Sequence, residues 1–260
     1  MNSSYSGYEH IRFERKDGIL RVTLDRPDVL NAINQRLHRE LAQAFFEIAL
    51  DPDTRVVILT GAGRAFCAGG DLGWMEQMLA APSPYGVMNA EAKRIVFGLI
   101  ELEKPIICRL NGDAMGLGAT IALLCDVVIA SDTARIADPH VRVGLVAGDG
   151  GALIWPQLIG YARARELLLG GGIVDAKRAV EIGLINRICV AEQLDAEVDR
   201  LAAQWSNGAI EAISWTKITV NIGLKQAMHA IMDAGMAYEA LSMREPFHAA
   251  AVAKMRSRGA

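Results

Sequence analysis

The sequence lacks the composition that marks several large classes of protein. Its four cysteines form no Cys-x-x-Cys pair, which argues against a disulfide framework and against a cysteine zinc site. Positive charge is not in excess, because the net charge is −3 at pH 7. A nucleic-acid-binding surface is therefore not indicated, and we expect reduced thiols and no nucleic-acid partner.

Long hydrophobic segments are also missing. The longest apolar run, residues 114–125, ends at Asp126 and is too short to span a bilayer. The first ten residues lack the basic and apolar segments of a secretory leader. These absences predict a cytoplasmic protein with no membrane partner.

Several catalytic motifs are absent from the chain. It contains no GxGxxG after a strand, no GxxxxGK[ST], no GxSxG and no HExxH. None of its five histidines stands at metal-ligand spacing from another. A Rossmann dehydrogenase, a P-loop NTPase and a zinc hydrolase are all disfavoured, and we expect no metal and no bound cofactor.

Strand and helix patterns alternate along most of the 260 residues. Short apolar runs bounded by turns predict buried strands at residues 19–24, 55–60, 105–110 and 127–130. Apolar residues spaced three and four apart predict helices at residues 34–50, 90–102 and 116–125, the first of them capped by Asn34. This alternation is typical of an α/β fold with a largely parallel sheet.

The strand pattern ends near residue 190. Three helical blocks follow, with breaks near residues 207–208, 223 and 245–246. We therefore divide the chain into a core of strands and helices, residues 1–190, and a C-terminal helical region, residues 191–260.

Three glycine-bearing segments are the candidates for chemistry: Gly61–Leu72, Asn111–Thr120 and Asp138–Gly151. The first two each leave a predicted strand and enter a predicted helix. Backbone amides at such helix starts attract an anion, and one N–H from each loop would form an oxyanion hole. The alternative is that these loops are only the tight turns of an α/β sheet.

These segments resemble those of the crotonase (enoyl-CoA hydratase/isomerase) family over nearly the whole chain. The similarity lies in RPDVLNAIN, AFCAGGDL, NGDAMGLGAT, CDVVIA and the run Gly183-Leu184-Ile185-Asn186. The resemblance implies a spiral of ββα turns with C-terminal helices used for trimerisation, often paired into hexamers. It also implies an acyl-CoA thioester as substrate, so that coenzyme A arrives as part of the substrate.

The resemblance further implies which amides hold the thioester oxygen. The first would be that of Ala68, within the substrate-binding run Ala68-Gly69-Gly70-Asp71, and the second that of Leu117. The family usually has glycine at the second position. A leucine still offers its N–H there, and its side chain should narrow the acyl pocket.

The acid and base positions differ from the two glutamates of the family's hydratases. The first position is Thr120 and the second is His140. The Thr120 hydroxyl can hold a water, or it can bond a backbone carbonyl of its own helix. A neutral imidazole at His140 would serve as the base near pH 7, although an exposed loop histidine is the alternative.

Asp149 is a third candidate for a catalytic role. It is either the N-cap of a helix that starts near Gly150, or the partner that orients His140 and favours its cation. The second arrangement resembles a branch of the family that hydrolyses C–C bonds in β-diketones. In that branch an additional histidine of the oxyanion region would fall at Leu117, whereas this sequence retains the AGGD run.

The sequence therefore predicts an enzyme that stabilises a thioester enolate. Enoyl-CoA hydration or isomerisation, by a lyase or an isomerase using His140 and Asp149, is the leading hypothesis. A C–C hydrolase of a β-dicarbonyl compound is the alternative enzyme. A non-catalytic CoA-binding scaffold that has lost its glutamates is a third possibility.

Overall fold

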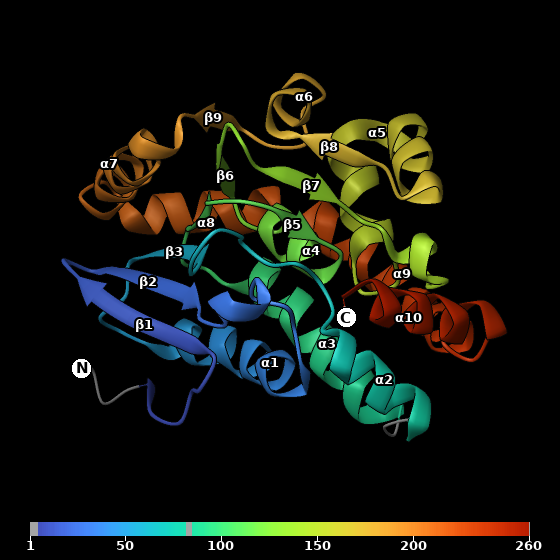
Figure 1. Ribbon diagram of the computed structural model, residues 1–260. Helices are drawn as coiled ribbons and strands as arrows, with labels where there is room; N and C mark the ends of the chain where they lie inside the picture. The colour runs from blue at the N-terminus through green and yellow to red at the C-terminus, as the bar shows by residue number, and fades with distance from the viewer. Residues whose placement is uncertain (1–4, 82–84, 260) are drawn as a thin grey trace.

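The computed structural model describes residues 5–81 and 85–259. Residues 1–4, which belong to the ten-residue segment examined for a secretory leader, lie outside the described residues. Two β-sheets form the centre of the molecule, with helices packed around them (Figure 1). The expected crotonase-type mixture of strands and helices, ending in a helical segment, is confirmed.

The larger sheet has six strands in the order β1-β2-β3-β4-β6-β9. β1 and β2 pair antiparallel, and every later neighbour is parallel. The four predicted strands are all present within two residues of their expected bounds, and they join two further strands at the edges. The six strands are β1 (Ile11–Lys16), β2 (Ile19–Leu24), β3 (Val56–Gly61), β4 (Ile106–Leu110), β6 (Val127–Ser131) and β9 (Arg187–Cys189).

The smaller sheet consists of β5 (Ala114–Met115), β7 (Arg135–Ala137) and β8 (Ile173–Asp175). These strands are too short to leave a periodic pattern in the sequence. β5 and β7 are parallel, so the residues that follow them emerge at the same edge. There the N–H of Gly116 donates to the carbonyl of Ala137 at 3.0 Å. The small sheet thereby places two of the three glycine-bearing segments side by side.

Helices cover the sheets and form the wall of the site. Asn34 caps the first helix as predicted, because its side-chain oxygen accepts a hydrogen bond from the N–H of Leu37 at 2.8 Å. This helix packs against α3 (Tyr85–Glu101), and α2 (Leu72–Ala80) lies against α10 (Pro246–Gly259) (Figure 1). The helices before residue 190 are α1 (Gln35–Leu50), α2 (Leu72–Ala80), α3 (Tyr85–Glu101), α4 (Leu117–Leu123), α5 (Gly151–Gly170) and α6 (Ala176–Glu181), with short 3-10 turns η2 (Pro27–Val29) and η3 (His140–Val143).

The chain beyond residue 190 is helical, as the sequence predicts. After the turn η4 (Ala191–Gln193) it forms α7 (Leu194–Ser206), α8 (Ile210–Val220), α9 (Ile222–Ser242) and α10 (Pro246–Gly259). In the described part of the chain, no helix combines the length and the apolar character needed to cross a membrane.

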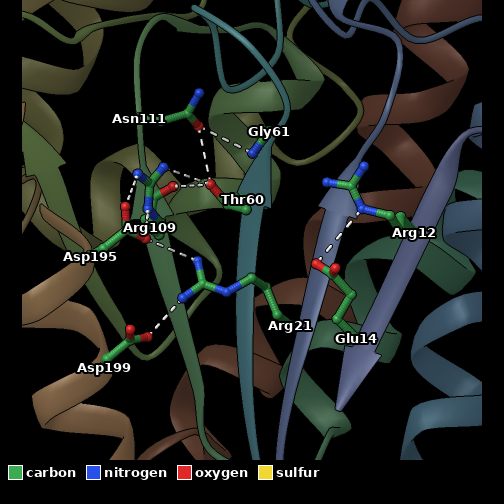
Figure 2. A network of polar contacts seen from close by, with 9 residues as sticks. All are labelled: Arg12, Glu14, Arg21, Thr60, Gly61, Arg109, Asn111, Asp195 and Asp199. Carbon is green, nitrogen blue, oxygen red and sulfur yellow. Dashed lines mark hydrogen bonds and ion pairs between the residues drawn. The ribbon is translucent and has the colours of Figure 1, made fainter. Parts of the chain in front are cut away.

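Two of these helices are integral to the core. α7 packs on the six-stranded sheet, where Asp199 pairs with Arg21 of β2 at 2.7 Å and Asp195 pairs with Arg109 of β4 at 2.7 Å (Figure 2). α9 contributes a row of buried methionines to the main hydrophobic core. The described chain beyond residue 190 is helical, and one hydrophobic core is shared by the segments before and after that position.

Candidate active site

The two amide-rich loops are held together by Asn111, the first residue of the second loop. Its side-chain oxygen accepts a hydrogen bond from the N–H of Gly61 at 3.1 Å, and its amide donates to the carbonyl of Gly63 at 3.0 Å (the first is drawn in Figure 2). Further along, the N–H of Met115 donates to the carbonyl of Cys67 at 2.9 Å. The two loops therefore form one rigid unit.

The amide predicted to bind the thioester oxygen in the first loop is already occupied. The N–H of Ala68 donates to the carbonyl of Leu30 at 3.0 Å, which contradicts its predicted use as an oxyanion donor. Two residues later, Gly70 lines the cavity of the site. Its N–H takes part in no hydrogen bond with any residue that the structure describes. The amide of Gly70 is thus free and borders the cavity.

The second loop presents the amide of Leu117. This residue begins α4 and lines the same cavity, and its N–H has no acceptor within the described ranges. The preceding Gly116 marks how close the parts are: a β-carbon there would lie 4.0 Å from Cα of Gly69 and 3.4 Å from Cε1 of His140. The two loops and His140 therefore converge on one point.

The other predicted residues of the loops support the structure around the cavity without lining it. Asp71 caps α2 by accepting from the N–H of Trp74 at 3.1 Å, and it pairs with Arg26 at 3.0 Å. Gly69 accepts a hydrogen bond from the N–H of Ile33 at 2.7 Å through its carbonyl. These two residues therefore hold the first loop in place beside the cavity.

Thr120 is fully buried inside α4 and does not line the cavity. Its hydroxyl makes no hydrogen bond with any described residue, so the bond to a helix carbonyl that was considered for it is not formed. A β-carbon on Gly150 would lie 2.7 Å from its methyl group, which shows that Thr120 packs against the start of α5. The geometry gives no support to a catalytic role for Thr120.

His140 lies between two carboxylates. β7 ends just before Asp138, whose Oδ1 forms a short contact with Nδ1 of His140. On the other side, Oδ2 of Asp149 lies 3.3 Å from Nε2. The N-cap of α5 is Gly150, so the capping alternative for Asp149 is wrong. The predicted His140–Asp149 pair is present, and Asp138 is an additional partner that the sequence interpretation missed.

These partners decide the protonation of His140. Burial alone lowers the pKa of the imidazole, but the carboxylates of Asp149 and Asp138 more than offset it and hold the pKa well above its usual 6.5. The ring is therefore a cation at neutral pH. The expectation that a neutral imidazole acts as the base does not fit this environment, because the resting group already carries its proton.

Asp138, His140 and Asp149 also meet the spacing of a metal site. One potential ligand atom from each lies within 4.8 Å of the other two. Both nitrogens of His140 are directed at carboxylates, however, and a metal ligand needs a nitrogen lone pair free for the ion. The arrangement is that of an ion-pair triad.

Glu239 is a second acidic residue that the sequence interpretation did not single out. It projects from α9, is buried and lines the cavity. Burial, with a further contribution from the Asp149 carboxylate, raises the pKa of Glu239 from its usual 4.5 to about 8. Its carboxyl group is therefore protonated at neutral pH, and its Oε2 has no hydrogen-bond partner within the described part of the chain.

One pattern in the sequence does point to Glu239. The buried face of α9 carries Met228, Met232 and Met236 at intervals of four, and Glu239 follows three positions later on the same face. A carboxyl group on a buried helical stripe is expensive to bury unless it is protonated or paired. Such a residue is a candidate for function on that ground alone.

Close backbone approaches bring these acids to His140. A β-carbon on Gly148 would lie 2.2 Å from the carbonyl oxygen of Gly235 and 2.9 Å from Cβ of Glu239, so only glycine lets α9 pack against this loop. A β-carbon on Gly151 would lie 1.8 Å from Oδ2 of Asp138. The glycines of the third segment are therefore required for the acidic cluster to form.

The cavity has a volume of about 100 Å³ and a largely apolar wall. Its polar groups are two carboxyl groups and three imidazoles: Asp149, Glu239, His38, His140 and His248. Five methionines form much of the remaining wall: Met75, Met78, Met88, Met236 and Met243. A small apolar ligand with one reactive polar end matches this lining.

Comparisons with known proteins find similarity over nearly the whole chain. A family model described as enoyl-CoA hydratase/isomerase matches residues 14–252. A probable enoyl-CoA hydratase from Mycobacterium bovis is 33% identical over 252 residues, which cover 97% of this chain and 93% of that protein.

Solved structures of similar fold include two kinds of enzyme. The crystal structure of an enoyl-CoA hydratase/isomerase from Mycobacterium paratuberculosis has a TM-score of 0.92 and 36% identity, covering 96% of this chain and 100% of that one. A β-diketone hydrolase from the cyanobacterium Anabaena, bound to (S)-3-oxocyclohexyl acetic acid, has a TM-score of 0.86 and 28% identity, covering 94% and 97%.

Proposed function

Because this chain belongs to the enoyl-CoA hydratase/isomerase family, we propose that it binds an acyl-CoA thioester and stabilises the enolate formed from it. Hydration of an enoyl-CoA is the reaction that the site supports best. The observation that carries this proposal is the convergence of a protonated Glu239, the Asp149 carboxylate and two unoccupied backbone amides on one cavity.

The amides of Gly70 and Leu117 hold the thioester oxygen in this proposal. Both residues line the cavity, and their loops are joined through Cys67 and Met115. As the enolate forms, negative charge moves onto the thioester oxygen. Preorganised N–H groups stabilise this charge without reorganising, which is the largest contribution that such sites make to catalysis.

Glu239 and Asp149 move the two protons of the reaction. Asp149, which pairs with the His140 cation, accepts a proton from the water that attacks the β-carbon. Glu239, neutral at pH 7, donates its proton to the α-carbon of the enolate. The cation of His140 lies between Asp149 and Asp138 and pairs with both carboxylates. Two carboxyl groups from different parts of the chain thus replace the absent glutamate pair.

Leu117→Pro tests the oxyanion site. Proline is tolerated at the first position of a helix, and it removes the N–H that has no acceptor in the described chain. We expect kcat for crotonyl-CoA hydration to fall by about 10²–10³-fold, the usual effect of losing one oxyanion donor. The fall is measured by steady-state kinetics, with circular dichroism to verify folding.

Leu117→Ala is the matched control, because it shortens the side chain and keeps the N–H. Its kcat should stay within about tenfold of the original enzyme, since the donor is intact. A folded Leu117→Pro variant with undiminished kcat would remove Leu117 from the oxyanion site. If the enzyme without substitutions leaves crotonyl-CoA unchanged, hydration is excluded as its reaction.

C–C bond hydrolysis of a β-dicarbonyl compound is the second candidate. It needs the same parts, namely an activated water and an acid that protonates the departing enolate carbon, and the similar Anabaena structure is that of a β-diketone hydrolase. Incubation with crotonyl-CoA and with a cyclic β-diketone, followed by mass spectrometry, separates the two reactions. A non-catalytic scaffold would change neither compound, and the buried, protonated Glu239 argues against that reading.

The protein should form trimers or hexamers in the cytoplasm. The C-terminal helices leave large apolar side chains exposed, which on a single chain would be an unfavourable surface. These residues are Trp215, Val220, Ile222, Tyr238, Leu241 and Phe247. Light scattering at micromolar concentration should give three or six times the mass of the 28.1 kDa chain, and a stable monomer would contradict the proposal.

A further inference from the structure

A second histidine with its own carboxylate lies on the wall of the cavity. His38 projects from α1, is only 3% exposed and lines the cavity beside Trp74, whose ring centre is 5.4 Å away. Nδ1 of His38 lies 2.9 Å from Oε2 of Glu91, which belongs to α3. α1 packs against α3 (Figure 1), so this pair stands on the wall formed by the N-terminal helices.

The pair fixes the orientation and the tautomer of His38. Its hydrogen bond with His38 and a contact at 3.3 Å from Arg39 offset the effect of burial and lower the pKa of Glu91, which is therefore ionised. A carboxylate only accepts hydrogen bonds, so Nδ1 of His38 must carry the proton. Nε2 is then the nitrogen left to meet a ligand.

Nε2 of His38 has no hydrogen-bond partner among the residues that the structure describes. It is also not one of the fully enclosed, unpaired polar atoms of the molecule. The open space that this side chain borders is the cavity. A ligand in the cavity therefore meets an oriented imidazole nitrogen on this wall.

The surroundings make this nitrogen selective. The neighbouring wall consists mainly of methionines, Ile33, Trp74 and Ala92, which are apolar apart from the indole N–H of Trp74. A purely hydrocarbon acyl group would cover Nε2 and leave it unpaired, which costs binding free energy. His140 interacts with the carboxylates of Asp149 and Asp138, whereas His38 pairs with that of Glu91. The two imidazoles therefore offer independent polar contacts to a ligand.

We propose that His38 recognises a hydroxyl group on the acyl chain, beyond the β-carbon, so that the substrates of this enzyme are hydroxylated acyl-CoA esters. A hydroxyl both donates and accepts, so it pairs with Nε2 whether the imidazole is neutral or charged. A ketone only accepts and would require the charged ring. This inference rests on the proposed function, because it names the substrate class of the same site.

The test compares enoyl-CoA esters with and without a terminal hydroxyl. Two pairs are suitable: but-2-enoyl-CoA with 4-hydroxybut-2-enoyl-CoA, and pent-2-enoyl-CoA with 5-hydroxypent-2-enoyl-CoA. For the original enzyme, kcat/KM should favour the hydroxylated ester of at least one pair by about tenfold or more, as expected for one oriented hydrogen bond. In His38→Phe, which keeps a ring of similar shape, the preference should vanish or reverse.

Matched variants separate recognition from structural damage. Arg39→Gln removes the exposed contact of Glu91 and leaves the His38–Glu91 pair intact, so it should keep the preference. His38→Gln restores a hydrogen-bonding side chain and should recover part of the preference for the hydroxylated ester. His38→Met replaces His38→Phe in the comparison if the phenylalanine variant does not fold. The ratio within each pair is independent of the fraction of active enzyme.

Calorimetry distinguishes this inference from the proposed reaction. Butanoyl-CoA and 4-hydroxybutanoyl-CoA are saturated and undergo no hydration, yet the original protein should bind the hydroxylated ester about tenfold more tightly, and His38→Phe should not. That result supports recognition of the hydroxyl group by His38 even if hydration is not detected. Equal affinities and equal kcat/KM values within both pairs, or a preference that persists in His38→Phe, would overturn the proposal.

Discussion

Replacing Glu239 with glutamine should lower kcat for enoyl-CoA hydration by about 10²–10⁴-fold, the range expected for removing a general acid. Glutamine has nearly the same shape and remains uncharged, as the protonated glutamic acid is at neutral pH. The variant therefore preserves packing in the cavity and removes only the transferable proton. KM for the CoA ester should change little, because the lost interaction belongs to the transition state.

The pH profile provides the more specific signature of Glu239. Its pKa is raised to about 8, so the acid form is present below that pH and is lost as the pH rises through it. The activity should therefore fall above about pH 8 in the original enzyme. In Glu239→Gln the residual activity should lose this alkaline decline, since glutamine does not titrate.

Asp233→Asn is the matched control for this substitution. Asp233 lies on the same helix, but its side chain is exposed and pairs with Lys93 at the surface. Its kcat and pH profile should be those of the original enzyme. A Glu239→Gln variant with full kcat and an unchanged alkaline limb would show that another group delivers the proton.

Replacing His140 with glutamine should lower kcat by a similar factor, about 10²–10⁴-fold, for a different reason. The imidazolium is the positive charge between Asp138 and Asp149. Without it, two buried carboxylates face each other with no cation between them, and Asp149 loses the partner that orients it. Asp149 then no longer serves as the base for water.

His229→Gln controls for the loss of a histidine as such, because His229 is exposed on α9, with its ring centre 4.8 Å from that of Phe97. It should retain full activity. Affinity for a saturated acyl-CoA, measured by calorimetry, should be nearly unchanged in His140→Gln. If His140→Gln hydrates crotonyl-CoA at the original rate, the triad has no part in activating water.

Most strands of the larger sheet and the first helix could be predicted from the sequence. Apolar runs bounded by turns placed the four inner strands to within two residues, and Asn34 marked the start of α1. The reason is that strand and helix periodicity depends on neighbours within a few residues. The edge strand β1 was not recognised, and β5, β7 and β8 were too short to show a period.

The pairing of His140 with Asp149 was also open to prediction, since both lie within one glycine-bearing segment. The protonation state of His140 could not be predicted, because it depends on how deeply the ring is buried and on the second carboxylate at Asp138. The same limit applies to the first oxyanion amide. Only the folded loop shows that the N–H of Ala68 is taken by Leu30 and that Gly70 faces the cavity.

The remaining parts of the site were decided by packing between distant segments. Glu239 reaches the His140 triad because Gly148 lets α9 approach the third segment, and His38 meets Glu91 because α1 packs against α3. Burial next to like charge then protonates Glu239, whereas a hydrogen bond from His38 keeps Glu91 ionised. Residue type and spacing determined the elements and the loops; the contacts between those elements determined which acids and imidazoles face the cavity and which protons they carry.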